Sequence, residues 1–213
     1  MALPRHMFFL ICCFPFLTLS QNFELPFGEK FQKVKFELVN NLIIIPIEVN
    51  GAELSFILDS GVNKPILFNL SDKDSIQINN VSEIAIKGLG DGEPIDALSS
   101  RGNVFKIGNV VNKDQLLYVV MDTELNLSPR LGLPVHGIIG YDLFRDFVVE
   151  VNYSSKYLKL HAPSLYKPKK SSKIRTIPLR IVQNKAYVQG HVLMKNKRSI
   201  AVELLVDSGS SDA

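Results

Sequence analysis

The same short phrase occurs twice in this 213-residue chain, each time at the end of an apolar run. Residues 56–61 read FILDSG, and residues 204–209 read LLVDSG. In both copies a strand-like run leads an aspartate into a Ser-Gly turn, where glycine allows the chain to turn tightly. The two aspartates, Asp59 and Asp207, are 148 positions apart (207 − 59). Since short structural repeats have periods of roughly 20–50 residues, this spacing favours two matching lobes.

Most of the chain beyond its N-terminal segment has the patterning of strands. Residues 33–39 alternate between apolar and polar side chains. The Asn-Gly pair at 50–51 separates two apolar runs, 41–49 and 52–58, and is a strong hairpin signal. A short helix is expected near residues 141–146. The pattern therefore predicts a mostly-β fold, with 46% apolar residues to supply a core.

The first twenty residues resemble a secretory signal. Arg5 and His6 precede a mainly apolar run at 7–19, and Ser20 is a small residue before a candidate cleavage point. The run is shorter than the roughly 20 residues that a membrane-spanning helix needs. We therefore expect residues 1–20 to be a signal peptide and the protein to be exported, to the periplasm or out of the cell. Both cysteines lie in this segment, so the mature chain would have no thiol nucleophile.

Charge and histidine placement argue against several classes of partner. The formal net charge of +3 is too small to indicate a nucleic-acid partner. The basic run at 167–175 is flanked by proline and serine and is read as a solvated linker. His136, His161 and His191 stand alone in strand or turn patterns. We therefore expect no metal and no cofactor.

Two carboxylates on equivalent turns of matching lobes can meet across a pseudo-two-fold axis. At close range they cannot both ionise, so the pair shares one proton. The ionised member can take a proton from a bound water, and the protonated member can donate a hydrogen bond to the carbonyl that the water attacks. Ser60 and Ser208 are placed to reach across to the opposite turn.

Several motifs together resemble the aspartic peptidases. The ILDSG and LVDSG phrases are similar to the Asp-Thr/Ser-Gly signature of that family. Residues 137–153, GIIGYDLFRDFVVEVNY, resemble its apolar-apolar-Gly element with the following short helix and hairpin. Residues 88–94, GLGDGEP, occupy the place of a flap. The resemblance covers roughly residues 35–213 and is greatest to bacterial, exported, retropepsin-like aspartyl proteases, which often carry two repeats followed by a PDZ domain.

The resemblance implies a role for each motif residue. Asp59 and Asp207 would be the catalytic pair, and a glycine-rich flap would close over an extended peptide substrate. The supporting residues are the turn residues Ser60, Gly61, Ser208 and Gly209, the flap residues Gly88, Gly90 and Gly92, and Gly137, Ile138, Ile139 and Gly140 behind the active site.

The resemblance also implies a domain plan. A closed β-barrel lobe of the acid-protease type would span residues 21–164, followed by a linker at 165–173 and the incomplete start of a second lobe at 174–213. The second copy of the phrase has neither a flap nor an apolar-apolar-Gly element after it. We therefore expect the sequence to be a truncated form of a longer protein.

Aspartic-type endopeptidase activity is the function that these expectations favour. The first copy has Val62 after Gly61, where the family has a small hydroxyl residue or alanine. This departure leaves open a non-catalytic, exported module that holds peptides in the same groove. A third alternative is a homodimer in which two copies of the first lobe meet through Asp59.

Overall fold

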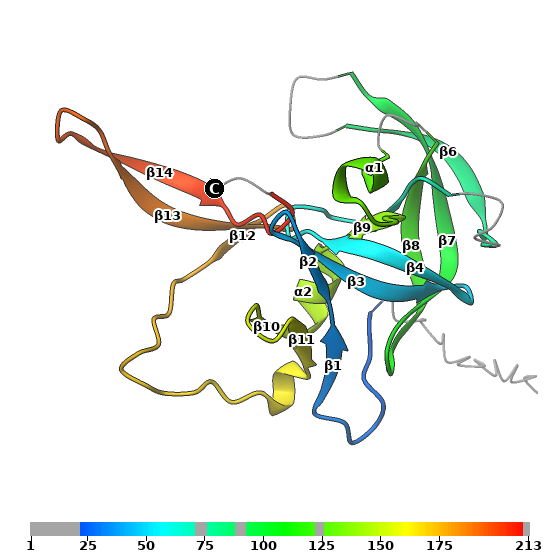
Figure 1. Ribbon diagram of the computed structural model, residues 1–213, viewed down its shortest axis with the longest axis horizontal. Helices are drawn as coiled ribbons and strands as arrows, with labels where there is room; N and C mark the ends of the chain where they lie inside the picture. Colours follow the sequence, from blue (N-terminus) through cyan, green and yellow to red (C-terminus); the bar gives the residue numbers. More distant parts are fainter. Residues whose placement is uncertain (1–21, 71–75, 88–92, 122–125, 211–213) are drawn as a thin grey trace, which may run out of the picture.

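The computed structural model describes residues 22–70, 76–87, 93–121 and 126–210 (Figure 1). The expected signal peptide and the flap glycines Gly88, Gly90 and Gly92 lie outside the described residues. Within those ranges the chain is built mainly of strands, so the mostly-β prediction is confirmed. None of the helices in the described ranges is both long and apolar enough to cross a membrane.

The main sheet of the described chain has the strand order β2-β3-β4-β9-β5-β8-β7-β6. A further pairing joins β3 and β7, the strands next to the two ends of this order. It closes a ring that runs from β3 through β4, β9, β5, β8 and β7 back to β3, with β2 and β6 outside it. The strands are β2 (Glu37–Val39), β3 (Leu42–Val49), β4 (Ala52–Leu58), β5 (Ile66–Leu67), β6 (Val81–Ile86), β7 (Ile95–Ile107), β8 (Val110–Val120) and β9 (Gly137–Ile139).

The hairpin predicted at Asn50-Gly51 is confirmed. β3 and β4 pair antiparallel up to Val49 and Ala52, and both turn residues have positive φ, 49° and 92°, as a tight hairpin turn requires. The Asn50 side chain also accepts a hydrogen bond from the Val104 N–H at 2.7 Å. This contact fastens the turn to β7 and helps to close the ring.

A smaller sheet packs beside the ring. It has the order β1-β11-β10, formed by β1 (Phe31–Lys35), β11 (Tyr157–His161) and β10 (Val148–Asn152). The helix expected near 141–146 is α2 (Tyr141–Asp146), and the structure adds α1 (Ser128–Leu131) and a 3-10 turn (Pro163–Leu165).

The core lies between the ring and the small sheet. Phe56 on β4 and Phe105 on β7 are both fully buried, with their rings edge to face and their centroids 5.9 Å apart. Leu158 and Leu160 of β11 belong to the same buried cluster. A second, smaller buried cluster includes Ile57 of β4 and Phe68. Apolar side chains on both faces of β4 are therefore buried just before Asp59 begins the first turn.

A third sheet, β12-β13-β14, projects away from this core (Figure 1). It is formed by β12 (Arg180–Val182), β13 (Lys185–Leu193) and β14 (Ser199–Leu205), and most of its residues are exposed. An extended segment joins the 3-10 turn to it, in the region predicted as a linker. The predicted second lobe and the domain boundaries stay predictions.

We predict that Phe105→Ala destabilises the fold strongly. The side chain is fully buried against Phe56 and Phe23, and truncating a buried phenylalanine costs about 3–5 kcal/mol through lost burial and a residual cavity. Urea unfolding measures the effect. Phe27→Ala is the matched control, because Phe27 is fully exposed and its loss should change the free energy of unfolding by less than about 0.5 kcal/mol. Equal stabilities of the two variants would contradict this description of the core.

Candidate active site

Asp59 directly follows strand β4 and lies at the end of the ring, next to the apolar-apolar-Gly element at residues 137–140. β4 and β9 pair in parallel, with Leu58 opposite Ile139. The Asp59 N–H donates to the Ile139 carbonyl at 2.8 Å. The element predicted to pass behind the first turn therefore lies directly against it, and the register of a parallel strand pair fixes where Asp59 leaves the sheet.

Glycines in this element allow the close approach. A Cβ atom on Gly140 would collide with the carbonyl oxygen of Asp59, and one on Gly137 would lie 2.5 Å from the carbonyl oxygen of Ile66. Just beyond, the Tyr141 N–H donates to the Val62 carbonyl at 2.9 Å. Glycine is needed at both positions because backbone and side-chain atoms of other segments fill the space of a Cβ.

Reciprocal hydrogen bonds between Ser60 and Ser208 join the two Asp-Ser-Gly turns. The Ser60 N–H donates to Oγ of Ser208 at 3.0 Å, and the Ser208 N–H donates to Oγ of Ser60 at 3.1 Å. Each hydroxyl then donates to a carbonyl of the opposite strand end, Ser60 to Val206 at 2.7 Å and Ser208 to Leu58 at 3.0 Å. We call this arrangement the serine clasp. It brings together two segments 148 residues apart with local two-fold symmetry.

The clasp places the two carboxyl groups next to each other. Oδ1 of Asp59 accepts the Gly61 N–H at 2.7 Å, and Oδ1 of Asp207 accepts the Gly209 N–H at 2.8 Å. A Cβ atom on Gly61 would lie 3.1 Å from Oδ1 of Asp59 and 3.7 Å from Cγ of Asp207, and a Cβ on Gly209 would collide with the Asp59 carboxyl group. The second turn therefore needs glycine for the carboxyl groups to meet, whereas a Cβ at Gly61 would be tight against the Asp59 carboxyl group.

The environments of the two carboxyl groups differ. Asp59 is partly buried, whereas Asp207 is exposed. The pKa of Asp59 is raised from 3.8 to about 6, and burial is the largest cause. The charge of Asp207 and a hydrogen bond between the two side chains also act to raise this pKa, while the Gly61 N–H and the ammonium group of Lys185 act to lower it. Asp59 therefore keeps a proton in mildly acidic solution.

The structure brings most of the expected site residues together. The two aspartates and their turn residues meet at one end of the ring, and the segment Gly137–Gly140 lies behind the first turn. The sequence analysis missed Lys185, which acts on Asp59 from the start of β13, and a charged network around Asp142 and Lys64. Lys64 follows the first turn closely in the sequence, but no short-range spacing links Lys185 or Asp142 to the turns. Among the described residues no three His, Cys, Asp or Glu side chains form a group that could hold a metal ion.

Comparison with known proteins finds a family match for the segment with the first Asp-Ser-Gly turn and not for the segment with the second. Residues 45–143 match the sequence model of a protein family described as aspartyl protease. The match includes Asp59 and the segment Gly137–Gly140, and it ends before Asp207. One similar solved structure is a retropepsin-like aspartic protease from Rickettsia conorii, 15% identical over 62% of this chain and 90% of that chain, with a TM-score of 0.43. No curated protein matches the chain significantly.

We predict that Asp59 makes folding stability fall as pH rises through about 6. Its pKa is higher in the folded chain than the ordinary 3.8 of the unfolded one, so the folded state binds an extra proton between these values. The resulting stabilisation is present below pH 3.8 and is lost as pH rises through 6. Asp59→Asn stays neutral and avoids this loss. Because the Asp59 carboxyl group is partly exposed, we expect its ionisation to lower the free energy of unfolding by about 1 kcal/mol. The Asp59→Asn variant should therefore melt about 2–4 °C above the wild type at pH 7.5.

Calorimetric melting at pH 4 and pH 7.5 checks this expectation. At pH 4 the Tm difference between the two proteins should be much smaller than at pH 7.5. A difference of the same size and sign at both pH values would show that the amide substitution acts through packing and not through the proton on Asp59.

Proposed function

We propose that this chain is an aspartic-type endopeptidase that hydrolyses peptide bonds with a water molecule activated by Asp59 and Asp207. The match of residues 45–143 to the sequence model of the aspartyl protease family supports this proposal. The observation that carries the proposal is the pairing of these two carboxyl groups across the serine clasp. The family match alone covers one carboxylate, whereas the chemistry needs two that share a proton.

The unequal environments of the pair suggest a division of roles. In the proposed division, Asp59, with its raised pKa, carries the shared proton, and the more exposed Asp207 acts as the base. In the proposed reaction Asp207 takes a proton from the water while the water oxygen forms a bond to the substrate carbonyl carbon. Asp59 donates its proton to the carbonyl oxygen. When the tetrahedral intermediate collapses, the C–N bond breaks and the amine nitrogen takes up the proton held by Asp207. One hydroxyl of the intermediate returns its proton to Asp59, which forms the carboxylic acid product and restores the starting pair.

A peptide or protein is the proposed substrate. The segment 88–94, proposed as a flap, connects β6 to β7 and has glycine at 88, 90 and 92. A hairpin of this kind could close over an extended peptide and exclude water during the reaction. The substrate would lie as an added strand, held mainly through its backbone.

The proposal also covers the location of the protein and the number of chains that form the site. We propose that residues 1–20 direct export, supported by their basic, apolar and small-residue pattern, and that residues 174–210 act as a second-lobe segment that supplies Asp207. Because both carboxyl groups come from one chain, we propose a monomeric site. Light scattering that shows an obligate dimer would favour the alternative of a site shared between two copies.

A non-catalytic peptide-binding module is the second candidate. Val62 occupies the position after Gly61 where the family has a smaller residue, and the Asp207 carboxyl group is exposed. Binding of a pepstatin-type transition-state mimic by the wild-type chain, without cleavage of any peptide in a mixed peptide library, would support this second candidate over the enzyme.

We predict that Asp59→Asn and Asp207→Asn each abolish peptide cleavage. Either change leaves a single carboxyl group, so the pair can no longer act as base and acid together, and kcat should fall by at least about 100-fold. A mixed-peptide cleavage assay at pH 4–5, read by mass spectrometry, measures the loss. Glu48→Gln is the control, since Glu48 lies at the hairpin end of β3 in an exposed ion pair with Lys106. Normal turnover by either aspartate variant would refute the paired mechanism.

A further inference from the structure

We propose that Lys64 is a positioning residue, which holds the Asp59 turn in register with Asp207 through its ion pair with Asp142 of α2. This inference rests on the proposed peptidase function and adds a residue that neither the sequence motif nor the family match singles out.

Backbone hydrogen bonds hold the segment 59–65 at its two ends and near its middle. The Asp59 N–H donates to Ile139 at 2.8 Å, and the Pro65 carbonyl accepts from Tyr118 at 2.9 Å. Between them, the Val62 carbonyl accepts from the Tyr141 N–H at 2.9 Å. The Lys64 side chain adds a charged contact to this set, and it reaches the same helix, α2, that Val62 contacts.

The partner of Lys64 is a buried carboxylate. Nζ of Lys64 lies 3.0 Å from Oδ1 and 3.4 Å from Oδ2 of Asp142. The Asp142 side chain is 1% exposed, and the Lys64 side chain is 23% exposed. Because a charge buried to this degree needs partners of opposite charge or strong donors, Asp142 strongly favours one position for the Lys64 ammonium group.

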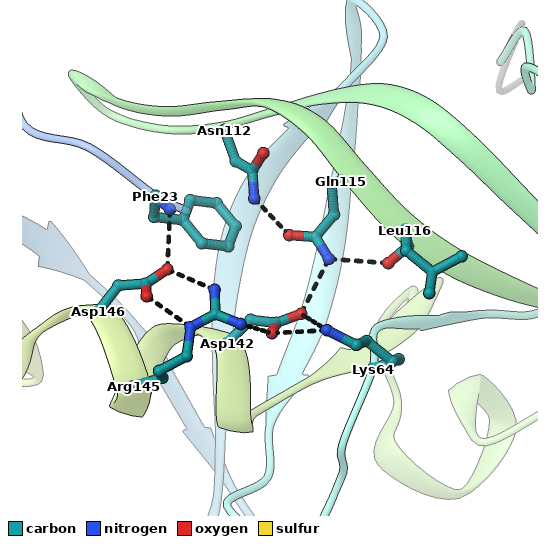
Figure 2. A network of polar contacts seen from close by, with 8 residues as sticks. All are labelled: Phe23, Lys64, Asn112, Gln115, Leu116, Asp142, Arg145 and Asp146. Atoms are coloured by element: carbon teal, nitrogen blue, oxygen red, sulfur yellow. Dashed lines mark hydrogen bonds and ion pairs between the residues drawn. The ribbon is translucent and has the colours of Figure 1, made fainter. Parts of the chain in front are cut away.

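Other residues fix Asp142 from two further directions (Figure 2). Nη1 of Arg145 lies 2.8 Å from Oδ1 of Asp142, and Nε2 of Gln115 donates to Oδ2 at 2.9 Å. Gln115 is itself oriented by Asn112 at 2.7 Å. The carboxylate is therefore anchored to β8 and α2 without Lys64. Removing Lys64 leaves Asp142 with an opposite charge and a donor, so the loop should lose its anchor while the fold survives.

The network continues to the first described residues of the chain. Arg145 also pairs with Asp146, 2.7 Å from Nε to Oδ1. Asp146 accepts the N–H of the buried Phe23 at 2.8 Å. Figure 2 shows these residues joined by consecutive polar contacts from the backbone N–H of Phe23 to the side chain of Lys64. The anchor for the catalytic turn is thus connected to α2, β8 and the N-terminal segment by a continuous set of polar contacts.

The position of α2 relative to the turn bears on the carboxyl pair. α2 begins directly after Gly140, whose Cα packs on the Asp59 carbonyl so closely that a Cβ would collide with it. A loop that slips on α2 would therefore carry Asp59 away from Asp207. Since catalysis can lose about 100-fold for a misplacement of 1 Å, a single ion pair at this point has a large effect on turnover.

The test compares Lys64→Met, which removes the ion pair, with Lys64→Arg, which keeps a cation. Two quantities are measured, kcat and KM for a peptide substrate and the pKa of the Asp59 carboxyl group by carbon-13 NMR. For Lys64→Met we expect kcat to fall about 10- to 100-fold with KM within about twofold, and the pKa of Asp59 to fall from about 6 toward 3.8. In Lys64→Arg, which keeps a cation, both kcat and the pKa of Asp59 should lie close to their wild-type values.

The direction of the pKa change separates position from charge. Loss of a nearby positive charge on its own would raise the pKa of Asp59, whereas a turn that moves away from Asp207 and into water would lower it. Lys106→Met is the matched control. It breaks an ion pair of similar length, 2.7 Å between Nζ of Lys106 and Oε1 of Glu48, at the hairpin end of β3. Both quantities should stay at the wild-type values in this control.

Two results would overturn the inference: an unchanged or raised pKa of Asp59 in Lys64→Met, or a kcat loss that Lys64→Arg does not restore. If Lys64→Met does not fold, Lys64→Gln, which keeps a neutral donor, takes its place with the same expectations. A wild-type chain that cleaves no peptide would refute the proposed function, and in that case the NMR titration still decides whether Lys64 positions the turn.

Discussion

The serine clasp is the contact on which the site depends. Two carboxyl groups at close range repel each other when both are ionised, so something other than their own attraction has to hold them together. Ser60 and Ser208 do this with reciprocal hydrogen bonds to backbone groups of the opposite turn. Each such bond contributes about 1 kcal/mol net. The same bonds fix the orientation of both turns, because each serine lies between its aspartate and its glycine.

The two halves of the clasp are supported unequally. The first turn follows β4 of the closed ring. The Asp59 N–H donates a hydrogen bond to β9, and Gly140 packs against the Asp59 carbonyl. The second turn follows β14, in a sheet whose residues are mostly exposed. This difference accounts for the different environments of the carboxyl groups. A partly buried Asp59 with a raised pKa faces an exposed Asp207, so the unequal surroundings favour Asp59 as the holder of the proton that the pair shares.

The sequence predicted the features that local pattern determines. The Asn50-Gly51 hairpin, the short helix at 141–146 and the meeting of the two Asp-Ser-Gly turns all follow from turn chemistry, periodicity and repetition. The contact between Lys64 and Asp142 could not be predicted, because it joins residues 78 positions apart in the chain and no repeat relates them. Lys185 was missed for the same reason: its effect on Asp59 depends on where β13 lies and not on any motif.

Cross-linking of the two turns tests the central claim most directly. In a chain with Cys12→Ser and Cys13→Ser, the further changes Ser60→Cys and Ser208→Cys place one thiol on each turn. The account predicts that mild oxidation forms a disulfide within single chains, seen by mass spectrometry as a linked pair of peptides from around residues 60 and 208. Disulfides only between different chains would show that the two turns do not meet within one chain and would contradict the account.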